Sequence, residues 1–156
     1  MIHREDIDEE LRELAFEFFY WFSRFEFSLK ENGRFYAGSR GVVHADWKRF
    51  IREHEALYQS CDAADALLRS PPDVQRVEKG SAPAWIPISF DKDQSKLSKT
   101  VLAVKTVRNN LFHGGKHCAE GWDNPERVRC LLERGVEVLH SFARLAGYEA
   151  DYLRRY

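Results

Sequence analysis

Cysteine is scarce in this chain, long apolar runs are absent, and neither sign of charge dominates. The three cysteines form no CxxC pair and match no zinc-ligand spacing, so we expect reduced thiols rather than a disulfide framework. The most apolar stretch, around residues 16–22, is too short and too charged to cross a membrane, and the charged amino terminus lacks the features of a signal peptide. The sequence therefore predicts a cytoplasmic protein with no membrane partner.

The charge balance excludes a protein that coats nucleic acid by net charge alone, because 24 lysines and arginines face 25 aspartates and glutamates. A local basic site is compatible with this balance. The 156 residues have the length of one domain, and we expect residues 1–156 to form a single helical unit. Aromatic residues make up 13% of the chain and include 11 phenylalanines, which predicts a phenylalanine-rich core.

Apolar spacing and turn signals predict an all-α fold, a bundle of four to five helices. Residues 71–90 hold four of the five prolines and are expected to form one long irregular loop, either a functional loop or a surface crossover. No segment alternates with period two for long enough to predict a strand. The expected helices cover residues 6–31, 45–59, 61–68, 91–112 and 124–146, the fourth of them capped by Asp91 or Asp93.

The first predicted helix is apolar on more than one face, so it has to be covered on more than one side. Either the other helices or a second copy of the chain can cover the additional face, and a homodimer is one of these two alternatives. The aromatic residues outside the main stripe are Phe16, Phe19, Tyr20, Trp21 and Phe27.

The segment 107–116 carries the most distinctive polar residues of the chain. At ~100° per residue, Arg108 falls near the middle of the apolar stripe of its helix, where a permanent charge needs a partner. One interpretation is a buried ion pair, for instance with Glu26, or a guanidinium that reaches the edge of the stripe. The other interpretation is a bound ligand.

Asn109 and His113 are four residues apart, and two glycines after His113 allow close approach of a ligand. Together with Arg108 and Lys116 they can converge at one helix end. Such a set suits a phosphodiester, because arginine can bind the non-bridging oxygens while histidine transfers protons. A histidine at a helix C-terminus can also be no more than a favourable dipole contact.

Arg108, Asn109 and His113, in an Arg-x4-His pattern on a helix of an all-helical chain, resemble the Arg-x4–6-His motif of the HEPN superfamily. The name stands for higher eukaryotes and prokaryotes nucleotide-binding. Residues 21–30 also resemble stand-alone bacterial members. The resemblance in architecture covers most of the chain, and the motif itself covers about ten residues.

The resemblance implies a bundle that dimerises, so that both copies of Arg108 and His113 line one cleft. It further implies a metal-independent endoribonuclease without a cofactor, acting as a toxin or in phage defence or RNA processing. RNA, a second copy of the chain and an antitoxin protein are the implied partners. His113 would handle protons, and Arg108 would stabilise charge as the 2′-hydroxyl attacks its own phosphate to give cyclic-phosphate and 5′-hydroxyl ends. The supporting or substrate-binding candidates are Asn109, Asn110, Lys116, Arg24 and Glu26.

Two alternatives remain open at the level of the sequence. Arg24 and Glu26 are either members of an intra-bundle ion pair or support for Arg108. A non-catalytic helical module, binding a nucleotide or a partner protein through the same cleft, is the rival of the ribonuclease.

Two further features are not expected. Metal binding by His113, His117 and Cys118 is disfavoured, since two glycines interrupt the helix between the histidines and no other residue completes a ligand set. Gly115 stands where toxins of this superfamily that are silenced by a nucleotidyltransferase often carry tyrosine, so control by tyrosine modification at that position is not expected.

Overall fold

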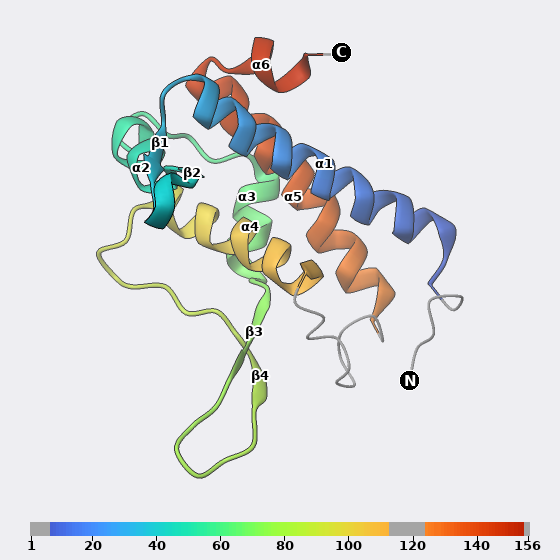
Figure 1. Ribbon diagram of the computed structural model, residues 1–156. Helices are drawn as coiled ribbons and strands as arrows, with labels where there is room; N and C mark the ends of the chain where they lie inside the picture. Colours follow the sequence, from blue (N-terminus) through green and yellow to red (C-terminus); the bar gives the residue numbers. More distant parts are fainter. Residues whose placement is uncertain (1–6, 113–123, 155–156) are drawn as a thin grey trace.

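The computed structural model describes residues 7–112 and 124–154 (Figure 1). This part of the chain is mostly helical, as predicted, but its described residues form six helices rather than four to five and also contain two small antiparallel sheets, which were not predicted. The helices are α1 (Glu9–Glu31), α2 (Trp47–His54), α3 (Asp62–Arg69), α4 (Lys96–Phe112), α5 (Pro125–Ala146) and α6 (Glu149–Leu153). The strands are β1 (Phe35–Ala37), β2 (Val43–Ala45), β3 (Asp73–Arg76) and β4 (Ala84–Pro87), with a short 3-10 turn, η2 (Ser39–Gly41), between the first two.

The two longest helices begin and end at the signals that the sequence carries. The Asp8 side chain caps α1 by accepting a hydrogen bond from the Leu11 amide at 2.8 Å. The Asn124 side chain caps α5 by accepting from the Arg127 amide at 3.1 Å. Gly147 ends α5 at a φ of 69°, in the left-handed region that glycine adopts without strain.

Several helix boundaries differ from the predicted ones, and α1 itself begins at Glu9 rather than at residue 6. The helix α2 stops at His54, and α4 begins only at Lys96, where the Ser95 hydroxyl accepts a hydrogen bond from the Ser98 amide at 3.2 Å. Residues 91–94 instead form a turn, in which the Gln94 amide donates a hydrogen bond to the Asp91 carbonyl at 3.2 Å. Ser95 therefore occupies the cap position of α4, and the predicted caps Asp91 and Asp93 lie two or more residues before it.

Residues 71–90 are not the single irregular loop that was predicted. They contain β3 and β4, which pair antiparallel with Asp73 opposite Pro87 and form a hairpin that extends away from the helices (Figure 1). The side-chain amide of Asn110 on α4 donates a hydrogen bond to the Asp73 carbonyl at 2.9 Å, which ties the base of the hairpin to α4. Strands of three or four residues are too short to produce a readable period of two.

The core lies between α1, α5 and the shorter helices, and it is rich in phenylalanine as predicted. The long helices α1 and α5 run side by side, with α6 against the carboxyl end of α1 (Figure 1). Gly135 permits this close packing, because a Cβ at that position would lie 2.4 Å from Cε2 of Phe18. None of the described helices is long and apolar enough to cross a membrane. The largest aromatic side chains that are fully buried are Phe18, Phe25, Phe50, Phe142 and Tyr152.

The second apolar face of α1 divides into a covered part and an exposed part. Trp21 packs against His140 and Tyr152, with ring centroids 4.8 Å away in both cases, so α5 and α6 cover that portion. Phe16 and Phe19 are 63% and 42% exposed, and the ring centroid of Phe19 lies 5.3 Å from that of the half-exposed Phe112. We call Phe16, Phe19 and Phe112 the exposed aromatic patch.

Candidate functional site

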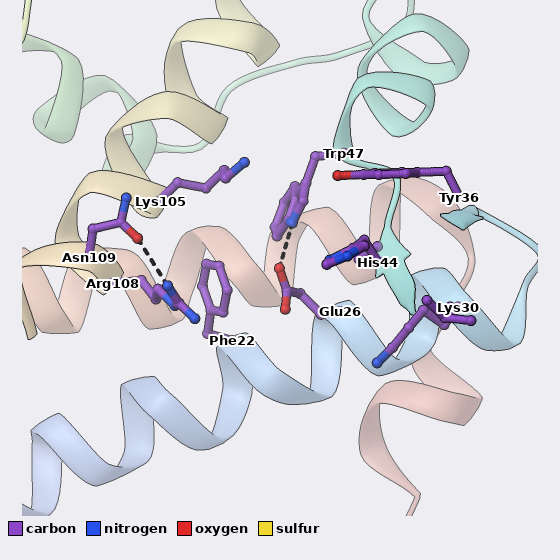
Figure 2. A pocket seen from close by; sticks show the side chains of 11 residues that line it. Phe22, Glu26, Lys30, Tyr36, His44, Trp47, Lys105, Arg108 and Asn109 are labelled. Carbon is purple, nitrogen blue, oxygen red and sulfur yellow. Dashed lines mark hydrogen bonds between the residues drawn. The ribbon is translucent and has the colours of Figure 1, made fainter. Parts of the chain in front are cut away.

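A hollow of about 270 Å³ lies where α1, the β1–β2 hairpin, the start of α2 and the second half of α4 meet (Figure 2). We call it the Arg108 hollow. Its walls combine aromatic rings with long cationic side chains. The lining residues are Phe22, Glu26, Lys30, Tyr36, Val43, His44, Ala45, Trp47, Lys105, Arg108 and Asn109.

Helical spacing explains how two of the elements supply their side chains. Phe22, Glu26 and Lys30 are four residues apart and therefore share one face of α1. Lys105 and Arg108 are three residues apart on α4 and also share a face. The two helices thus line one hollow with residues that are far apart in the sequence.

Arg108 is half-buried and lies against aromatic rings rather than in an ion pair. Its guanidinium carbon is 4.6 Å from the ring centroid of Phe112 and 5.8 Å from that of Phe22. Its Nη1 donates a hydrogen bond to Oδ1 of the adjacent Asn109 at 3.1 Å (Figure 2). No described carboxylate lies within ion-pair distance of it, so the interpretation of Arg108 as a member of a buried ion pair, for instance with Glu26, does not hold among the described residues. Most of the five N–H donors of the guanidinium are therefore available to an anion.

Glu26 faces the same hollow but has a different partner. Its Oε1 accepts a hydrogen bond from Nε1 of Trp47 at 2.8 Å, which joins α1 to the first residue of α2 (Figure 2). Glu26 therefore positions Trp47, whose ring in turn lies 5.9 Å from Nζ of Lys105. Glu26 thus lines the same hollow as Arg108 and holds the wall beside Lys105, while its supporting role stays a prediction.

The hollow is locally basic although the whole chain is nearly neutral. Lys30, Lys105 and Arg108 face one carboxylate, Glu26, among the described residues that line it. Long cationic side chains around a concave surface raise the local concentration of anions. The local basic site that the sequence left open is therefore present, and it contains Arg108.

Arg24 lies at another place in the fold. It is 8% exposed, it donates hydrogen bonds to the backbone carbonyls of Asp151 and Tyr152 on α6, and its guanidinium carbon lies 4.7 Å from the Phe27 ring centroid. It does not line the Arg108 hollow. The hypothesis that Arg24 supports Arg108 is thus replaced by a structural role at the contact between α1 and α6.

Of the remaining predicted site residues, the structure describes Asn109 and Asn110 but not His113 and Lys116. Asn109 is exposed and lines the hollow, whereas Asn110 is bonded to the β3 backbone as described above. His113 and Lys116 lie outside the described residues, as do Gly115, His117 and Cys118. In the sequence His113 directly follows Phe112, the last residue of α4.

Several lining residues were not predicted from the sequence. Lys105 is three residues before Arg108 and could have been found from helical spacing alone. Tyr36 and His44 could not, because they meet only through the register of β1 and β2, in which they are direct partners. Their rings stack at 5.3 Å between centroids with an angle of 24°. Within the described ranges, no group of three or more histidine, cysteine, aspartate or glutamate residues is placed to hold a metal ion.

Comparison with known proteins gives no family for this chain. No family model matches it, and no curated protein and no solved structure matches it significantly. The function of the Arg108 hollow must therefore be inferred from the side chains that line it and from the motif that continues into His113.

Proposed function

We propose that this protein is a metal-independent endoribonuclease of the HEPN type, which cleaves RNA at the Arg108 hollow. Arg108 binds a non-bridging phosphate oxygen, and His113 transfers the proton. The enzyme acts in the cytoplasm as a homodimer, as a toxin or in phage defence or RNA processing, and an antitoxin protein is a further candidate partner.

The observation that carries this proposal is the state of Arg108. Its guanidinium packs against aromatic rings and has no carboxylate partner among the described residues. Its positive charge and most of its N–H donors are therefore available to bind a phosphate. Lys30 and Lys105 line the same hollow and can neutralise neighbouring phosphates. Since His113 follows the last residue of α4 in the sequence, only four residues separate it from Arg108.

The reaction balances without any group beyond the RNA and the protein. The 2′-hydroxyl loses its proton and its oxygen forms a bond to the adjacent phosphorus, while the bond from phosphorus to the 5′-oxygen breaks. The 5′-oxygen takes up a proton, so the products are a 2′,3′-cyclic phosphate and a 5′-hydroxyl. Arg108 stabilises the charge that develops on the non-bridging oxygens, which is typically the larger catalytic contribution.

Cleavage of a labelled RNA by the purified chain tests this proposal. His113→Ala should lower the cleavage rate by about 10²–10⁴, because proton transfer is lost. Arg76→Ala, which removes an exposed arginine on β3, is the matched control and should cleave like the wild type. Mass spectrometry of the products should give cyclic-phosphate ends.

The rival function is a non-catalytic module that binds a nucleotide or a partner protein through the same hollow. It predicts that wild type and His113→Ala leave RNA equally intact, both in the cleavage assay and in total RNA from cells that express them. That result would refute the ribonuclease and leave the hollow as a binding site.

A further inference from the structure

A second hollow of about 450 Å³ adjoins the Arg108 hollow along the β1–β2 hairpin and α2. Tyr36, Ala45, Trp47 and Lys105 line both hollows, so the two adjoin along these residues, and we refer to them together as the groove. We call the second hollow the hairpin hollow. Its remaining lining residues are Asp46, Lys48 and Arg52.

The cations of the hairpin hollow are available to a ligand. Lys48 and Arg52 are four residues apart, share one face of α2 and are exposed. No carboxylate of the described chain lies within ion-pair distance of either. Asp46, the single acidic residue in the lining, caps α2 by accepting a hydrogen bond from the Arg49 amide at 2.9 Å. With Lys105 at the junction, cationic side chains therefore follow the groove from one hollow into the other.

An aromatic platform lies at the boundary of the two hollows. The Tyr36 ring stacks on His44 but remains 53% exposed, and Tyr36 lines both hollows whereas His44 lines only the Arg108 hollow. About half of the Tyr36 side chain is thus accessible although one face of its ring stacks on His44, and the two rings lie next to each other in Figure 2. The hairpin is built for this stack, since a Cβ at Gly38 would lie 2.7 Å from Nε2 of His44 and displace the ring.

From this geometry we propose that the groove binds single-stranded RNA, with one unpaired base stacked on Tyr36 and the phosphates beyond the cleaved bond held by Lys105, Lys48 and Arg52. The inference rests on the proposed function, because it extends the same strand from the Arg108 hollow. Every base has a stacking face, so Tyr36 binds without reading sequence. A paired base is not free to stack, so the groove selects single strands over duplexes.

Binding to an uncleavable probe tests the groove independently of catalysis. A fluorescent 2′-deoxy single strand of about eight nucleotides offers bases and phosphates but lacks the attacking hydroxyl. Tyr36→Ala should raise its Kd by about tenfold, and Tyr36→Phe, which keeps the ring, should change it by less than about twofold. Phe35→Ala is the matched control, since Phe35 is the exposed neighbour on β1 that lines neither hollow.

Salt dependence separates stacking from charge. The logarithm of the affinity falls linearly with the logarithm of the salt concentration. For single strands, each lost phosphate contact should make this slope less steep by about 0.7. Lys48→Ala and Arg52→Ala should each show this reduction, whereas Tyr36→Ala should weaken binding with the slope unchanged. Lys79→Ala, an exposed lysine between β3 and β4, is the charge control and should leave both affinity and slope unaltered.

Parallel cleavage of RNA distinguishes failure of the inference from failure of the ribonuclease. Tyr36→Ala should raise KM with kcat nearly unchanged. Three binding results would overturn the inference: no measurable affinity of the wild type, a Kd unaffected by Tyr36→Ala, or a duplex or poly-glutamate that binds as tightly as the single strand. The last result would show that the groove binds acidic partners through charge alone, without stacking of a base. Tyr36-dependent binding without cleavage would support the groove and refute the ribonuclease.

Discussion

Replacing Arg108 by alanine should damage RNA cleavage far more than folding. The contacts that are lost are two ring faces, Phe22 and Phe112, and one hydrogen bond to the neighbouring Asn109. Cation–π contacts that are not desolvated contribute about 0.5–1 kcal/mol each, so the loss of two should lower the free energy of unfolding by about 1–2 kcal/mol. Because the positive charge of Arg108 no longer stabilises the phosphate oxygens in the transition state, the cleavage rate should fall by about 10²–10³.

Arg24 supplies the matched control for this measurement. It is buried and its guanidinium is bonded to two carbonyls of α6, so Arg24→Ala should lower the free energy of unfolding by about 2–3 kcal/mol. Urea unfolding gives the stabilities, and initial rates on a labelled RNA give the activities. If Arg108→Ala is as destabilised as Arg24→Ala, Arg108 is a structural residue. If Arg108→Ala folds and cleaves like the wild type, the proposed site is wrong.

Four further outcomes are expected. Cleavage should persist in excess EDTA, and loss on chelation with recovery in magnesium would contradict the proposed chemistry. Light scattering at micromolar concentration should give twice the monomer mass, and Phe16→Glu in the exposed aromatic patch should return the monomer. Gly135→Ala should lower the thermal midpoint despite the better helix propensity of alanine, because the new Cβ overlaps Phe18 and overpacking costs about 1–3 kcal/mol. Burial lowers the pKa of His140 below its ordinary 6.5, so the unfolded chain takes up the proton first. The free energy of unfolding should therefore fall as the pH drops below 6.5, less steeply in His140→Gln.

The helices were predictable where the sequence carries its own boundary signals. Asp8 and Asn124 cap α1 and α5, and Gly147 ends α5 in a conformation that glycine favours. The two hairpins were not predictable, because each strand is three or four residues long. Pairing across the turn, with Tyr36 opposite His44, determines these strands rather than any local pattern.

The candidate site was predictable only in part, for the same reason. Helical spacing places Lys105 and Arg108 on one face of α4, and this information is local. The meeting of that face with Lys30 and Tyr36 depends on how α1 and the β1–β2 hairpin pack against α4. The sequence therefore indicated Arg108 on α4 and missed the residues that, under the proposed function, would hold the rest of the substrate.

Arg24 and Arg108 look alike in the sequence, because each interrupts an aromatic or apolar stretch of its helix. Their different roles follow from which acceptors the fold brings to them. The last carbonyls of a helix have no intrahelical partner, and the terminal turns of α6 supply two of them to Arg24, which can therefore be buried. Arg108 packs against aromatic rings and donates one hydrogen bond to the side-chain amide of Asn109, and these contacts leave most of its N–H donors unused. A guanidinium in that state gains most from a bidentate phosphate, so under the proposed function we expect Arg108, and not Arg24, to bind RNA.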